Sequence, residues 1–138
     1  MNVPALRKLY SLMCAIPARE ISLNLFYMRS PDTGCVWGCG LGYAAKFELC
    51  GLHLETGMGL PEFTSEAGVE YKGLYAAEKA FGVTGQESMD LFCAAHKSRY
   101  DGAASDHKAM WLNRVECFFN EKGLSLGEPV VVDVPALV

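Results

Sequence analysis

The chain has 138 residues, of which 51% are hydrophobic and 20% are charged; this composition excludes a disordered chain, and the length is that of one domain, residues 1–138. The formal net charge is −4 and the basic residues are scattered, which disfavours the clustered positive surface that duplex nucleic acid requires. No apolar stretch approaches the ~20 residues needed to cross a bilayer, so no membrane partner is expected.

An amphipathic helix is the first predicted element, over residues 3–16. Large apolar residues recur there at three- and four-residue spacing, with Asn2 as the N-cap and Pro17 as the stop. A helix explains these residues better than a secretory signal does. Residues 20–28 then alternate between apolar and polar, which predicts a half-buried strand, and residues 30–34 have the composition of a turn.

A glycine-rich stretch at residues 34–42 leads into a short helix, predicted over residues 43–50 with Gly51 as its C-cap. Residues 52–70 carry scattered glycine and proline. They predict a long ordered loop, with a short strand at residues 52–54. Loops of this length are often functional.

A helix–turn–helix pair is predicted next. The alanine-rich run at residues 71–81 ends at Gly82, which suits a helix C-terminus. Thr84 and Glu87 then have the spacing of a capping box, in which side chain and backbone satisfy each other's hydrogen bonds at a helix start. The buried side chains expected on this helix are Met89, Leu91, Phe92 and Ala95.

The last predicted helix starts after Ser105 or Asp106 and ends at Gly123. The β-branched run at residues 130–134 predicts a strand that pairs with residues 20–28. A strand edge can also pair with another chain, so a homodimer through this C-terminal strand is expected. The predicted fold class is α+β, with four or five helices packed on a small antiparallel sheet of two or three strands.

Four soft metal ligands lie within nineteen residues: Cys35, Cys39, Cys50 and His53. Tetrahedral zinc sites use such short-range pairs, so a zinc-stabilised interaction module is one hypothesis. The alternative is that the thiols are buried among apolar side chains and the histidine is exposed. A helix between the two pairs would hold them apart, because it rises ~1.5 Å per residue. This favours the alternative, and no cofactor is expected.

Cys39 also precedes a predicted helix N-terminus, where the helix dipole stabilises a thiolate. With His53, His96 or His107 as the base, Cys39 would be the nucleophile of a hydrolase or transferase. The alternative is a cysteine buried in the core, and nothing in the sequence places a histidine beside it.

The small residues Gly40 and Gly42 would let backbone amides at this helix start approach a phosphate. Close helix packing is the alternative for these glycines. Trp37 and Tyr43 flank them and are the predicted contacts of a ligand base, while Arg29, Lys46 or Arg99 would bind its phosphate. For these aromatic rings the alternative is packing in the core.

Several short motifs, taken together, resemble one group of proteins. They are Cys39-x2-Gly42-x-Ala44, Gly51-Leu52-x-Leu54, Pro61-x-Phe63, Gly73-x2-Ala76-Ala77-x3-Phe81-Gly82, Leu91-Phe92 and the helix around Arg114 to Phe119. Over residues 5–123 the chain resembles small uncharacterised proteins of bacteriophages and some actinobacterial replicons. Cys35, the Trp37-Gly38 pair and the valine-rich tail are not part of this resemblance.

The resemblance implies a phage or mobile-element setting, in the cytoplasm of a host cell, where small accessory proteins act on the host or its defences. It supplies no known active site to transfer. The sequence also shows no credible set of acid, base and nucleophile, so we expect a non-enzymatic binding protein that counters host defence by sequestering a nucleotide-like signal or a host protein. The alternatives are the Cys39-dependent hydrolase or transferase and the zinc-stabilised module.

Overall fold

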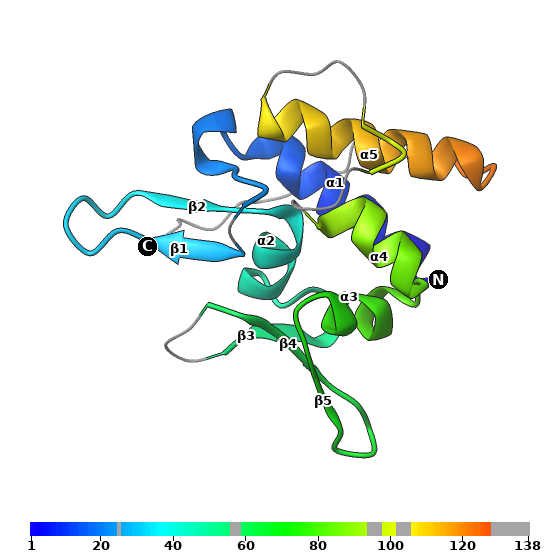
Figure 1. The fold of residues 1–138 in the computed structure, drawn as a ribbon, viewed down its shortest axis with the longest axis horizontal. Coiled ribbons are helices and arrows are strands. Elements are labelled where there is room, and N and C mark those ends of the chain that lie inside the picture. Colours follow the sequence, from blue (N-terminus) through cyan, green and yellow to red (C-terminus); the bar gives the residue numbers. More distant parts are fainter. Residues whose placement is uncertain (25, 56–58, 94–97, 102–105, 128–138) are drawn as a thin grey trace.

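The computed structural model describes residues 1–24, 26–55, 59–93, 98–101 and 106–127. In this part of the chain it has five α-helices, two short 3-10 helices and two small antiparallel sheets, one of two strands and one of three (Figure 1). The predicted α+β class is confirmed. The strands form two separate sheets, however, where the sequence predicts one.

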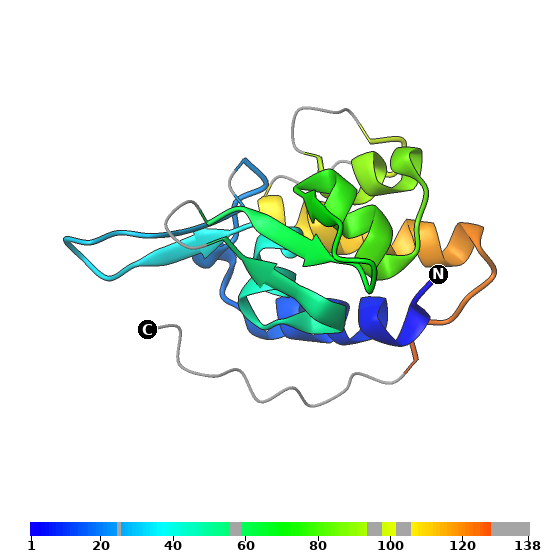
Figure 2. The ribbon, with the colours of Figure 1, turned by 90° about the horizontal axis from the view of Figure 1, so that it is seen from below.

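Helices α1 (Val3–Ala15) and α5 (His107–Glu121) pack side by side, as Figures 1 and 2 show. Both predicted N-caps are confirmed. Asn2 Oδ1 accepts a hydrogen bond from the Ala5 amide at 3.2 Å, and Asp106 Oδ1 accepts one from the Ala109 amide at 2.7 Å. Each satisfies an amide that has no partner inside its helix.

Strands β1 (Tyr27–Arg29) and β2 (Val36–Gly38) form an antiparallel hairpin that extends away from the helices (Figure 2). The predicted strand at residues 20–28 is wrong over its first part. Residues 18–20 form the 3-10 helix η1 (Ala18–Glu20), in which Glu20 N donates to the carbonyl of Pro17 at 2.9 Å. After η1, Ile21 forms only an isolated bridge and residues 23 and 24 lie in a turn, so only the end of the predicted segment, from Tyr27, is a strand.

Helix α2 (Gly40–Lys46) begins three residues earlier than predicted and ends before residue 50. Its N-cap is Cys39, whose Sγ accepts a hydrogen bond from the Gly42 amide at 3.4 Å. The helix stops because Glu48 adopts a left-handed backbone conformation with φ of 55°. A second 3-10 helix, η2 (Leu49–Gly51), follows.

The short strand predicted at residues 52–54 is confirmed, whereas the long loop predicted for the rest of residues 52–70 is wrong. Strands β3 (Leu52–Leu54), β4 (Pro61–Thr64) and β5 (Glu70–Lys72) form an antiparallel meander in these residues. Gly59 and Gly68 lie in its two connections with φ of 65° and 81°, a conformation that glycine adopts without strain. Strands of three or four residues are too short to show a clear alternation in the sequence.

Helices α3 (Leu74–Phe81) and α4 (Gly85–Phe92) confirm the predicted pair, but α3 begins later than the predicted residue 71, because residues 71 and 72 belong to β5. Thr84 N donates to Glu87 Oε1 at 2.9 Å and Glu87 N donates to Thr84 Oγ1 at 3.2 Å, which completes the capping box. On α4, Leu91 and Phe92 are buried as expected, but Met89 is 37% exposed, so its predicted burial is wrong. Ala95 lies outside the described residues.

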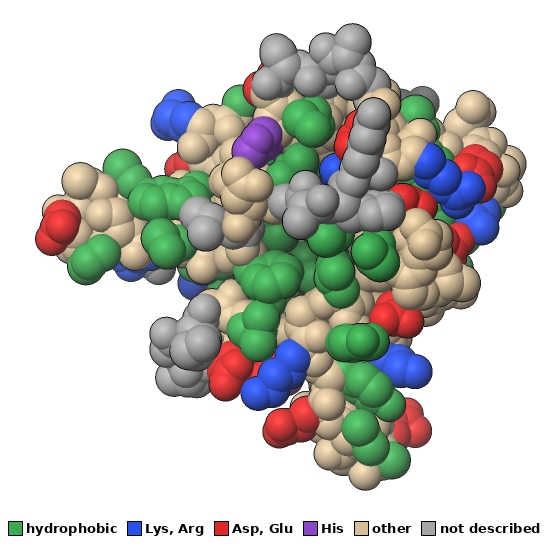
Figure 3. All heavy atoms as spheres, viewed as in Figure 1, with side chains coloured by type: hydrophobic (Ala, Val, Ile, Leu, Met, Phe, Trp, Pro, Cys, Tyr) green, Lys and Arg blue, Asp and Glu red, His purple; other side chains and the backbone are tan. Residues whose placement is uncertain are grey.

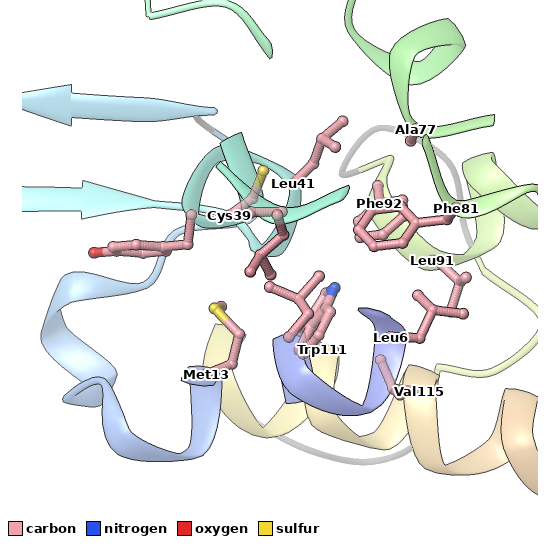
Figure 4. Packing of buried hydrophobic residues seen from close by; sticks show 14 of the residues in the cluster. Leu6, Met13, Cys39, Leu41, Ala77, Phe81, Leu91, Phe92, Trp111 and Val115 are labelled. Carbon is pink, nitrogen blue, oxygen red and sulfur yellow. The ribbon is translucent and has the colours of Figure 1, made fainter. Parts of the chain in front are cut away.

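Trp111 of α5 lies at the centre of the core, among side chains from α1, α2 and α4 (Figure 4). Its ring stacks on Phe92 at 6.4 Å, and Phe92 stacks on Phe81 at 5.6 Å. These contacts join the helices into one hydrophobic core. The predicted strand at residues 130–134, and the homodimer through it, lie outside the described residues.

Candidate functional site

A hollow of about 340 Å³ lies between η1 and the second arm of the hairpin; we call it the hairpin hollow. Its volume is at the lower end of the range for small-molecule sites, ~300–1,000 Å³. The residues that line it come from η1, the hairpin turn and β2. They are Arg19, Glu20, Thr33, Gly34, Cys35, Val36 and Trp37.

The hollow exists because two segments meet at one end and separate at the other. Ser22 N donates to the carbonyl of Gly38 at 2.9 Å, and Ile21 forms a parallel bridge with the same glycine. Before Ile21 the chain coils into η1, so it leaves the edge of β2. The space that opens along β2 beyond Gly38 is the hollow.

Trp37 is the one predicted aromatic contact in the lining of the hollow. It is partly buried and lies opposite Met28 in the strand register. A partly buried indole at the wall of a hollow offers an apolar face to a planar ligand ring.

Tyr43, the other predicted aromatic contact, is fully buried beneath η1. Its hydroxyl donates to the carbonyl of Glu20 at 2.6 Å, and its ring packs edge-on against Tyr27 at 5.8 Å. Burial raises the pKa of Tyr43, so the hydroxyl remains a donor at neutral pH. Tyr43 therefore supports the wall that η1 forms and does not line the hollow.

Gly40 and Gly42 allow close packing of the helix, which was the alternative to an anion-binding site formed by the backbone amides at the helix start. A Cβ on Gly40 would lie 2.5 Å from Cε2 of Trp111, and one on Gly42 would lie 1.2 Å from the carbonyl oxygen of Phe26. Both glycines are buried, and the Gly42 amide already donates to Cys39 Sγ. The backbone amides at this helix start therefore do not form the predicted phosphate site.

Of the two predicted arginines, Arg29 lies near the hollow and Arg99 does not line it. A guanidinium nitrogen of Arg29 is 4.0 Å from the position of a Cβ on Gly34. Arg99 instead forms ion pairs with Asp90 of α4 at 3.2 Å and Glu121 of α5 at 3.1 Å. It links two helices on another part of the molecule.

Arg19 and Glu20 are lining residues that sequence reasoning missed. Arg19 precedes the segment predicted to be a strand and Glu20 begins it, and nothing in the sequence places η1 beside β2. The only local signal is Pro17, which can start a helical turn.

Cys39 and His53 do not form a catalytic pair. Cys39 is 1% exposed, and burial raises the pKa of its thiol to about 11, so it is not a thiolate at neutral pH. His53 is on β3, where its Nε2 is 3.5 Å from Glu62 Oε2. His107 Nδ1 accepts a hydrogen bond from the Leu23 amide at 3.0 Å. His96 lies outside the described residues.

The predicted zinc ligands are also not assembled. Cys35 is exposed on the hairpin and Cys39 is buried in the core. Cys50 is in η2, where burial raises its pKa to about 11, and His53 is on β3. Within the described ranges, no group of three or more histidine, cysteine or acidic side chains could hold a metal ion.

A second polar feature that the sequence did not reveal is a row of charges across β3, β4 and β5. His53, Glu62 and Lys72 are direct cross-strand neighbours, and Lys72 Nζ lies 3.8 Å from Glu62 and 3.6 Å from Glu55. Exposed pairs of this kind contribute little to stability. Figure 3 shows acidic and basic side chains interleaved on the face in view, without a basic stripe.

No protein-family model, no curated protein and no solved structure matches the chain. The helices in the part of the chain that the structure describes include none that is long and apolar enough to cross a membrane.

Proposed function

We propose that this is a non-enzymatic binding protein that captures a small nucleotide-like ligand in the hairpin hollow. The observation that carries the proposal is the position of Trp37, partly buried in the wall of a hollow of about 340 Å³ whose lining also includes Arg19. An aromatic face beside a cation is the combination that binds a base together with its phosphate.

The ring of Trp37 supplies one part of the expected affinity. Stacking of a base on an aromatic side chain contributes about 1–3 kcal/mol. Arg19 and Arg29 are both exposed, so water and salt screen their attraction for a phosphate. Their main effect is to attract and orient an anionic ligand.

The state of Cys39 supports binding over catalysis. A nucleophile must reach its substrate and form a thiolate, and the Cys39 side chain is buried with a raised pKa. Among the described histidines, His53 and His107 are engaged with Glu62 and Leu23 respectively.

The resemblance to phage proteins supplies the biological setting of the proposal. In the cytoplasm of an infected host, a protein that sequesters a nucleotide signal would counter a defence that depends on that signal. A host protein is the other partner that the sequence leaves open.

Melting temperature measured with a panel of cyclic mono- and dinucleotides tests the proposal. A ligand at about 100 times its Kd stabilises the folded protein by about 2.7 kcal/mol, which raises Tm by about 8–12 °C for a chain of this size. Trp37→Ala should reduce this increase, because losing about 1–3 kcal/mol of stacking raises Kd about 5- to 150-fold. Tyr75→Ala is the matched control, because Tyr75 is 70% exposed on α3 and does not line the hollow.

An increase that Trp37→Ala leaves unchanged would place the ligand elsewhere on the protein. No increase with any member of the panel would refute nucleotide capture, and a host protein would then be the remaining partner.

A further inference from the structure

The two edges of β2 differ in their hydrogen bonding. Ser30 N donates to the carbonyl of Cys35 at 2.8 Å, and Cys39 N donates to the carbonyl of Phe26 at 3.2 Å. In an antiparallel pair, residues alternate between those that bond with the partner strand and those that point away from it. The odd-numbered residues of this arm therefore bond with the β1 side of the hairpin. The even-numbered residues direct their N–H and C=O groups to the opposite edge.

That outer edge is covered at Gly38 and open at Val36. The Gly38 carbonyl accepts the hydrogen bond from Ser22 N. Because the chain before Ile21 coils into η1, it does not continue alongside β2. The N–H and C=O of Val36 consequently face the hairpin hollow, and no described residue pairs with them.

Unpaired groups at this position point to a polar ligand. Val36 is only 4% exposed, and buried backbone N–H and C=O groups are nearly always hydrogen-bonded. Ligand sites commonly use backbone groups of this kind to fix the orientation of the bound molecule.

The number of open groups indicates which kind of ligand fits. Only Val36 offers both an N–H and a C=O at this edge. On one side of it the Gly38 carbonyl is already hydrogen-bonded, and on the other side lies the hairpin turn, where Gly34 N donates to the Ser30 carbonyl at 2.9 Å. An added peptide strand needs a ladder of several such residues. One donor beside one acceptor instead matches the edge of a planar heteroaromatic ring.

We infer that Val36 reads the hydrogen-bonding edge of a nucleobase, with its C=O accepting from a base N–H and its N–H donating to the adjacent base acceptor. This inference rests on the proposed function and narrows the ligand to a base with an unblocked donor–acceptor edge. Trp37, the next residue, would pack against the same base, as enzymes that hold single bases combine edge hydrogen bonds with stacking.

Methylated nucleotides test the inference. N6,N6-dimethyl-AMP lacks the amino donors of AMP, and 1,N2,N2-trimethyl-GMP lacks the ring and amino donors of GMP, while each keeps its ring and phosphate. For whichever parent nucleotide binds, the methylated form should bind at least about tenfold more weakly, because the Val36 carbonyl would be left buried without a partner.

Equal affinity of parent and methylated nucleotides would overturn the reading by Val36 and leave the proposed capture intact. Failure of AMP, GMP and the cyclic nucleotide panel to bind would overturn both.

Val36→Pro provides a test on the protein side. Proline removes the N–H that faces the hollow, and a strand accepts proline where that N–H is not used in the ladder. Val36→Ala is the comparison, because it also shortens the side chain but retains the N–H. We expect Val36→Pro to bind AMP or GMP at least about tenfold more weakly than Val36→Ala. Equal binding by the two variants would overturn the inference, and the methylated nucleotides decide it if Val36→Pro does not fold.

Discussion

Replacing Tyr43 with phenylalanine should weaken both the fold and the hairpin hollow. The Tyr43 hydroxyl donates to the carbonyl of Glu20 at 2.6 Å, and the side chain is fully buried. Tyr43→Phe keeps the ring and its edge-on contact with Tyr27 but removes this hydrogen bond. The carbonyl of Glu20, which belongs to the wall of the hollow, is then left without its donor.

The expected loss follows from the burial of this bond. Leaving a buried acceptor unpaired costs about 1–2 kcal/mol, which for a chain of this size lowers Tm by about 3–8 °C. Urea denaturation should show a lower midpoint with an unchanged m-value, since the surface exposed on unfolding is the same. Tyr75→Phe is the control and should leave Tm unchanged, because Tyr75 is exposed. If Tyr43→Phe and Tyr75→Phe melt together, the argument that Tyr43 holds η1 in place is refuted.

Three further predictions follow from the core. Gly42→Ala should prevent folding or lower stability by more than about 3 kcal/mol by urea denaturation, because the added Cβ would meet the carbonyl of Phe26; wild-type stability would contradict this packing. Arg114→Leu should cost about 3–5 kcal/mol, because the 1%-exposed guanidinium pairs with Asp101 at 2.7 and 3.2 Å; a loss below about 1 kcal/mol would show that the ion pair contributes little. Burial raises the pKa of Cys39 from 9.0 to about 11, so the folded state favours the neutral thiol. The stability this gives is present below pH 9 and is lost as the pH rises from 9 to 11. Measured by denaturation across that range, the free energy of unfolding of Cys39→Ala should therefore fall less steeply than that of the wild type.

Three of the helix starts could be predicted because their signals are local. The Thr84–Glu87 capping box and the caps at Asn2 and Asp106 each involve residues within three positions of one another. Such contacts form wherever the segment is helical, so the sequence alone reveals them.

The short strands could not be predicted with the same success. Each strand of the β3–β4–β5 meander has only three or four residues, and its connections supply the glycines that made residues 52–70 look like a loop. The hairpin was closer to prediction, since the turn at residues 30–34 was expected. If a strand had been predicted on each side of that turn, Trp37 would have been placed on the second strand of the hairpin.

The site depends on contacts between distant parts of the chain, which no local pattern specifies. Position 40 must be glycine because Trp111, from the last helix, packs against it, and position 42 must be glycine because the backbone of Phe26 lies where a Cβ would be. Arg19 lines the hollow because the bridge between Ile21 and Gly38 holds this part of the chain beside β2. Both kinds of contact become visible only when the fold is known.

Tryptophan emission during titration tests the central claim most directly, because the chain has only two tryptophans. Trp37 lines the hollow, whereas Trp111 is 1% exposed in the core. Addition of a bound nucleotide should change the emission of the wild-type protein and leave Trp37→Phe, which retains only Trp111, unchanged. An equal change in both proteins, or a nucleotide that binds without altering the emission of Trp37, would show that the hairpin hollow is not the binding site.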